Sequence, residues 1–125
     1  KQLEIKDLPS TIEKIQSELS NFIKKFPKNK IAIWGAGHQA LTLITLSKIE
    51  KKIKYIVDSA SFKQNKFAPG SNLKIVSPNE FRKDNMKAVV IMAAGFSDEV
   101  CKTIKSFDNK IKIAILKNNQ LEKIH

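Results

Sequence analysis

Five short apolar runs in the chain are separated by polar stretches and by segments whose apolar residues recur at helical spacing. The runs predict strands at Lys30–Trp34, Lys54–Val57, Leu73–Val76, Ala88–Met92 and Ile111–Leu116. Strands that alternate with helices in this way predict an α/β fold, with a parallel sheet of about five strands and helices on both faces. The chain has 125 residues, of which 42% are hydrophobic, and we expect one domain over residues 1–125.

The first helix is expected over about residues 10–26. Residues 8–10 are expected to end an extended lead-in. Ser10 and Glu13 have the spacing of a capping box, which would start the helix there. Apolar residues then recur at helical spacing, at Ile12, Ile15, Leu19, Phe22 and Phe26. We assign no element to the polar tail after Lys117.

The stretch Lys30–Ala40, KIAIWGAGHQA, joins the first predicted strand to a helix through a glycine turn. Gly35 and Gly37 bracket the turn, and Ala40 completes a G-x-G-x-x-A dinucleotide-binding pattern. Glycines let the backbone approach a ligand closely, and the N–H groups at a helix start attract a phosphate or carboxylate. Many α/β domains use the same turn only to pack helix against strand. The pattern therefore predicts a Rossmann-like three-layer sandwich and leaves open whether the turn contacts a ligand.

Asp58 follows the second predicted strand, twenty-three residues after Gly35. In a dinucleotide-binding unit an acidic residue at this place binds the ribose hydroxyls. The sequence Asp-Ser-Ala-Ser is equally good turn chemistry, so Asp58 is also a candidate cap of the next turn. Residues 59–72 then form a long polar loop of a kind that is uncommon without a function. Its two aromatic residues, Phe62 and Phe67, either stack on a base or sugar or, as we expect more, anchor the loop to the core.

A second turn of small residues, 93–97, follows the fourth predicted strand, and Ser97 is expected to cap the next helix. With a strand order of 3-2-1-4-5, the first, second and fourth strands end at the edge where open parallel sheets bind ligands. We therefore expect residues 35–38, 58–59 and 93–97 to form one crevice. The candidate binding residues are Gly35, Ala36, Gly37, His38, Gln39, Asp58, Ser59, Ala94, Gly95, Phe96 and Ser97.

Histidine and cysteine are too few for several kinds of active site. His38 and the terminal His125 are the only histidines, which leaves no histidine metal cluster and no Ser-His-Asp triad. Cys101 is the only cysteine, which excludes an intrachain disulfide and a thiolate metal site, and we expect it to be a small buried residue. His38 either donates to an anion at the helix start or is solvated. We predict no catalytic residue and no metal ligand in the chain.

The net charge of +11 comes from twenty-two lysines and one arginine, Arg82, spread along the whole chain. Nucleic-acid binding favours clustered charge and arginine, so we expect a solvated basic surface without a nucleic-acid partner. No apolar run approaches the roughly 18 residues that span a bilayer, and the chain start lacks a signal-peptide core. We expect a soluble, cytoplasmic protein without a membrane partner.

Three segments carry a resemblance to a known family: WGAGHQALTL, YIVDSASFKQNKFAPGSNLKIVSP and VVIMAAGFSDEV. In order and spacing, over about residues 10–117, they resemble the C-terminal domain of bacterial S-adenosylmethionine-dependent sugar C-methyltransferases. The resemblance implies a domain that holds a nucleotide-linked deoxysugar, for example a thymidine diphosphate sugar. It also implies an upstream cysteine-rich zinc module and a middle S-adenosylmethionine domain that methylates the acceptor carbon beside a ketone.

The resemblance implies that the cofactor and the catalytic residues lie outside these 125 residues. Trp34 stands where a common S-adenosylmethionine site would have an acidic residue before its G-x-G turn, so we expect no cofactor in this chain. The chain begins at Lys1 and not at methionine, and we expect the C-terminal fragment of a longer methyltransferase, not catalytic by itself. The alternative is a self-contained NAD(P)- or nucleotide-sugar-binding Rossmann module.

Overall fold

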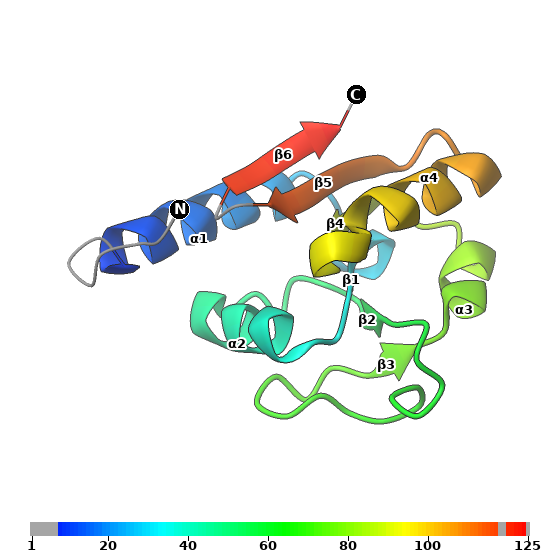
Figure 1. The fold of residues 1–125 in the computed structure, drawn as a ribbon, viewed down its shortest axis with the longest axis horizontal. Coiled ribbons are helices and arrows are strands. Elements are labelled where there is room, and N and C mark those ends of the chain that lie inside the picture. Colours follow the sequence, from blue (N-terminus) through cyan, green and yellow to red (C-terminus); the bar gives the residue numbers. More distant parts are fainter. Residues whose placement is uncertain (1–7, 118–119, 125) are drawn as a thin grey trace.

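A six-stranded sheet forms the centre of the computed structural model, which describes the backbone of residues 8–117 and 120–124 and the side chains from residue 12 onward (Figure 1). The strand order is β3-β2-β1-β4-β5-β6, and β1 to β5 are parallel, as predicted. The strands are β1 (Ile31–Trp34), β2 (Ile56–Val57), β3 (Ile75–Val76), β4 (Ala88–Ile91), β5 (Lys112–Lys117) and β6 (Gln120–Ile124). The prediction of about five strands is therefore one strand short.

The sixth strand, β6, lies in the tail to which no element was assigned. It pairs antiparallel with β5, and Leu121 is buried while Gln120, Glu122 and Lys123 are exposed. A strand that buries one side chain at a sheet edge carries almost no hydrophobic signal, which explains the omission. Charged residues on such an edge also protect it from pairing with other chains.

Helices cover both faces of the sheet and make three layers. The helices are α1 (Leu8–Ile23), α2 (His38–Ser47), α3 (Pro78–Lys83) and α4 (Ser97–Phe107), and the short 3-10 helices are η2 (Lys28–Lys30) and η3 (Ala94–Phe96). Side chains alternate along β1: Ile31 and Ile33 pack with α1 and α2, while Ala32 and Trp34 pack with α3 and α4. Cys101 is buried in the core between the sheet and helices α3 and α4, as predicted.

The first helix begins earlier than predicted. Helix α1 already includes Leu8, Pro9 and Ser10, so the prediction that Ser10 caps a helix starting behind it is wrong. Proline fits the first turn of a helix, where its missing N–H is not needed, and this allows the earlier start. The remainder of the expected lead-in, residues 1–7, lies outside the described residues.

The long loop between β2 and β3 doubles back along β3. The N–H groups of Asn65 and Ala68 donate to Ile75 and Leu73 carbonyls, both at 2.7 Å. Phe62 and Phe67 are 69% and 63% exposed, so the expectation that they anchor the loop to the core is wrong. Ala68 is buried in the core instead, because the backbone hydrogen bonds bring this small residue, and not the rings, against the sheet.

Candidate functional site

The three predicted segments meet at the carboxyl edge of the sheet. Strand β1 lies between β2 and β4, so the residues that follow these three strands surround one cavity of about 430 Å³. Its lining residues are Trp34, Gly35, Ala36, Gly37, Asp58, Ser59, Lys63, Met92, Ala93, Ala94, Phe96 and Val100. We call this cavity the glycine-turn crevice. His38, Gln39 and Gly95 line a second cavity beside it.

The two glycines of the turn have different roles. Gly35 has a φ of +122°, and a Cβ there would lie 2.4 Å from the carbonyl oxygen of Met92. Its N–H donates to the carbonyl of Val57 at 2.7 Å, so Gly35 fits the turn tightly between β2 and β4. Gly37 has ordinary backbone angles, φ −76° and ψ 166°, and a Cβ there would meet nothing within 4 Å. Packing therefore requires Gly35, whereas Gly37 leaves space on the cavity side.

Asp58 holds two turns together. Its Oδ2 accepts from the N–H of Ala36 and its Oδ1 from the N–H of Ala60, both at 2.8 Å, and its side chain is only 15% exposed. The bond to Ala60 confirms that Asp58 caps the turn after β2. The bond to Ala36 also ties the end of β2 to the glycine turn. Binding of ribose hydroxyls by this carboxylate stays a prediction.

Lys63 lines the glycine-turn crevice and was not among the predicted site residues. Its ammonium donates to the carbonyl of Ala36 at 3.3 Å and lies 3.9 Å from Oδ2 of Asp58. Of the described residues that line this cavity, Lys63 is the one with a positive charge. Nothing in the sequence separates Lys63 from the other lysines, so only the folded loop reveals it.

The start of α2 presents backbone donors at the edge of the crevice. The N–H of Leu41 makes the first bond of the helix, to the carbonyl of Gly37 at 3.0 Å. The N–H groups of His38, Gln39 and Ala40 therefore have no acceptor within the helix, and Gly37 supplies no side-chain cap. Because the positive end of the helix dipole lies here as well, this corner favours an anion.

The turn after β4 differs from the prediction. Ser97 was expected to cap α4, but Phe96 occupies the N-cap position without a side-chain cap, and Ser97 already has helical backbone angles. The Ser97 hydroxyl is fully buried and accepts from the N–H of Ala93 at 3.2 Å, so it closes the turn and lines neither cavity. The 3-10 helix η3 shifts the start of α4 and turns Phe96 outward, 68% exposed.

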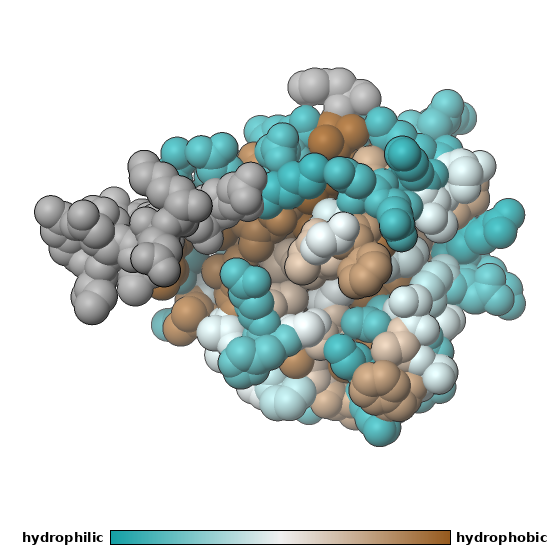
Figure 2. Space-filling view, viewed as in Figure 1, coloured by the Kyte–Doolittle hydropathy of each residue, from teal (hydrophilic) through white to brown (hydrophobic). Residues whose placement is uncertain are grey.

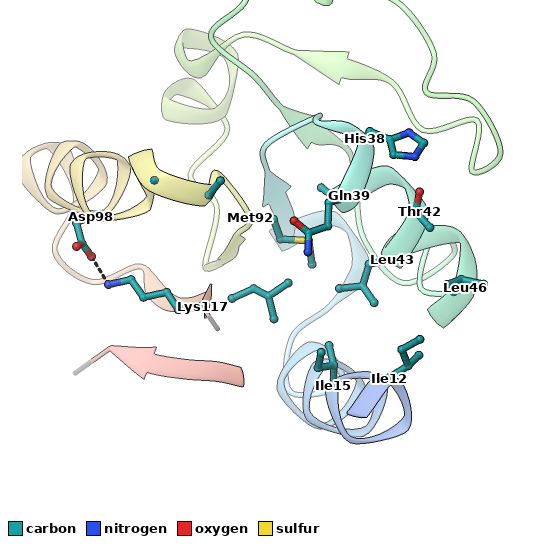
Figure 3. A pocket seen from close by; sticks show the side chains of 14 residues that line it. Ile12, Ile15, His38, Gln39, Thr42, Leu43, Leu46, Met92, Asp98 and Lys117 are labelled. Carbon is teal, nitrogen blue, oxygen red and sulfur yellow. Dashed lines mark hydrogen bonds and ion pairs between the residues drawn. The ribbon is translucent and has the colours of Figure 1, made fainter. Parts of the chain in front are cut away.

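The second and larger cavity, of about 720 Å³, lies between α1, α2 and the ends of β4 and β5 (Figure 3). Its lining is mainly apolar, and Met92 and Ala94 line both cavities. At one side Lys117 donates to Asp98 at 2.6 Å, and this hydrogen bond raises the pKa of the Lys117 ammonium above its usual value. On the face shown in Figure 2, hydrophobic surface is open to solvent among hydrophilic side chains.

A model of the family described as the C-methyltransferase C-terminal domain matches residues 4–116. The chain belongs to this family. The resemblance expected from the sequence is thereby confirmed, and the glycine turn, Asp58 and the turn after β4 all lie within the matched residues of this C-methyltransferase C-terminal domain.

Among solved structures, the domain is similar to UDP-D-quinovosamine 4-dehydrogenase from Vibrio fischeri, with a TM-score of 0.59. The two share 15% sequence identity, and the likeness covers 80% of this chain and 95% of that one. At this identity the likeness shows the Rossmann-like fold alone. No curated protein matches the chain.

The described part of the chain holds neither a membrane-spanning helix nor a metal-binding cluster. Residues 8–117 and 120–124 contain no helix that is long and apolar enough to cross a membrane. Within the same residues, no three side chains of the metal-binding types His, Cys, Asp and Glu come together in a group that could hold a metal ion.

Proposed function

We propose that this domain holds a nucleotide-linked deoxysugar while another part of the same methyltransferase polypeptide transfers the methyl group. The observation that carries the proposal is the corner of the glycine-turn crevice where the turn meets the start of α2. There Gly37 and Lys63 line the same crevice, and the N–H groups of α2 that have no acceptor within the helix follow directly after Gly37. A diphosphate in this corner would gain charge-assisted hydrogen bonds from these N–H groups and from Lys63.

The nucleoside and the sugar would extend from this corner. Ser59 and Asp58 offer hydroxyl and carboxylate oxygens beside the diphosphate, and the exposed ring of Phe96 offers an apolar surface in the lining of the same crevice. A thymidine diphosphate sugar is the substrate that we favour, on the basis of the family resemblance. The Vibrio fischeri protein is named for another nucleotide sugar, UDP-D-quinovosamine, but the likeness of the two folds does not extend to substrates.

S-adenosylmethionine fits this chain poorly. Trp34, and not an acidic residue, precedes the glycine turn, and the ring of Trp34 packs edge-on against Phe81 in the core. We therefore place the cofactor, and the residues that act on the acceptor carbon, in an upstream domain of the same polypeptide. The part assigned to the present residues is to bind the substrate and orient it.

The competing proposal is a nicotinamide cofactor in the same crevice, which the G-x-G-x-x-A pattern and Asp58 would also suit. A titration of the isotope-labelled 125-residue protein separates the two. We would add a thymidine diphosphate sugar, NAD and S-adenosylmethionine in turn and follow the amide signals of Gly35, Gly37, Gly95 and Ser97. Shifts with the nucleotide sugar support the proposal, shifts with NAD alone support the nicotinamide cofactor, and no shift with any ligand leaves the turn as a packing device.

A further inference from the structure

Helices α1 and α2 form two walls of the larger cavity, whereas no residue of α1 is among the lining residues of the glycine-turn crevice. Ile12 and Ile15 of α1 face Leu43 of α2 across the cavity (Figure 3), and Leu116 of β5 also lines it. We call this cavity the α1–α2 groove. We propose that the α1–α2 groove is the docking surface for the methyl-transferring part of the same polypeptide, an inference that rests on the proposed function.

Helix α2 is apolar on more sides than the sheet can cover. Ala40 and Ile44 face the sheet and are buried, whereas Leu43 lines the groove half-buried and Leu46 lines it 53% exposed. A helix that is apolar around most of its circumference is typical of one covered on both sides. A continuous apolar surface in a groove with a polar rim is also typical of a protein interaction site.

The groove is already formed in the domain. The side-chain amide of Gln16 donates to the carbonyl of Leu46 at 3.2 Å, which fixes α1 against the end of α2. The ion pair between Lys117 and Asp98 supplies a polar rim at the other side. A preformed apolar groove loses little conformational entropy when a partner surface enters it.

Two observations favour the methyl-transferring part of the polypeptide as the occupant. The family is that of a C-terminal domain, so the rest of the enzyme connects through the N-terminal side, and the early turns of α1, with Ile12 and Ile15, form a wall of the groove. In addition, Met92 and Ala94 line both the groove and the glycine-turn crevice. A domain seated in the groove would therefore border the proposed nucleotide sugar, as methyl transfer requires.

Hydroxyl-radical footprinting of side chains tests the proposal directly. We would compare the labelling of Leu46 in the 125-residue protein and in the longer methyltransferase polypeptide, with Phe67 as an internal control. Phe67 is 63% exposed and lines neither cavity. We expect labelling of Leu46 to fall several-fold in the longer polypeptide while that of Phe67 is unchanged. Equal labelling of Leu46 in both proteins overturns the proposal.

A pair of variants in the longer polypeptide adds a functional readout. Leu46→Lys should slow methyl transfer several-fold and restore the solvent exposure of the groove, whereas Phe67→Lys should do neither. In the 125-residue protein, Leu46→Lys should leave nucleotide-sugar affinity unchanged, and a loss of that affinity would overturn the proposal because the groove would then belong to the ligand site. A dimer of the 125-residue protein that Leu46→Lys dissociates would overturn it too, because a second copy would then fill the groove.

The outcome also separates this inference from the proposed function. Protection of Leu46 in a longer polypeptide that binds no nucleotide sugar supports docking and refutes the substrate. Binding of the nucleotide sugar without protection of Leu46 refutes docking and leaves the substrate intact.

Discussion

Replacing Gly35 with alanine should destabilise the domain strongly, although the change adds a single methyl group. The new Cβ would lie 2.4 Å from the carbonyl oxygen of Met92 and 2.8 Å from its carbon, both backbone atoms that cannot move aside without distorting β4. The backbone angle of +122° adds a second cost, because L-residues rarely adopt it. Left-handed backbone costs about 1–2 kcal/mol and overpacking about 1–3 kcal/mol, so we expect a loss of roughly 2–5 kcal/mol in unfolding free energy.

Gly37→Ala is the matched control in the same turn. Its Cβ would meet nothing within 4 Å and its backbone angles suit alanine. We therefore expect this variant to be unchanged or more stable, by up to about 1 kcal/mol, because alanine restricts the unfolded chain. Urea unfolding of both variants, followed by circular dichroism, measures the difference. If Gly35→Ala unfolds at the same urea concentration as Gly37→Ala, the assignment of Gly35 to packing is refuted.

Three further variants test the surroundings of the site. Asp58→Asn should cost about 1–3 kcal/mol of unfolding free energy, since the amide cannot accept from both the Ala36 and Ala60 N–H groups; an unchanged urea midpoint would contradict this. Lys63→Met should weaken nucleotide-sugar binding about tenfold with a stability change below about 1 kcal/mol, measured by calorimetry and urea unfolding; unchanged affinity would remove Lys63 from the site. Burial, and then a 2.7 Å hydrogen bond to Asp84, raise the pKa of Tyr55 above its usual 10.0. As the pH rises, the Tyr55 hydroxyl therefore ionises at a lower pH in the unfolded chain than in the folded one. Wild-type stability should then fall above pH 10 more steeply than that of Tyr55→Phe, by up to about 1.4 kcal/mol per pH unit, and parallel pH profiles would refute this assignment.

The strand order was predictable because each buried parallel strand is a short run of apolar residues, as in Ile31–Trp34 and Ala88–Ile91. Such runs are apolar on both faces, and the segments between them have helical spacing, which constrains the topology to a few choices. Strand β6 was missed because its pattern contains a single buried residue, Leu121. Its place depends on pairing with β5, which a local sequence pattern does not encode.

Only those residues of the crevice that directly follow a strand could be predicted from the sequence. The positions of Gly35, Asp58 and Ala94 at one edge follow from the strand order. The contribution of Lys63 depends on how the loop after β2 folds back, and the buried role of Ser97 depends on the extra turn η3. The α1–α2 groove was also missed. It depends on how α1 packs against α2, and the spacing of residues in the sequence does not determine how two helices cross.

The central claim is that the space beside Gly37 receives part of a nucleotide sugar. The most direct measurement is the dissociation constant of a thymidine diphosphate sugar for the wild-type domain, for Gly37→Ala and for Gly37→Val, each verified as folded by its amide spectrum. Because a Cβ at Gly37 would meet no protein atom within 4 Å and the backbone there has ordinary angles, we expect both variants to fold, and a loss of affinity in a folded variant would come from the occupied space. We predict weaker binding with increasing side-chain size, and no detectable binding for Gly37→Val. A folded Gly37→Val domain that binds the nucleotide sugar as tightly as the wild type would contradict the account.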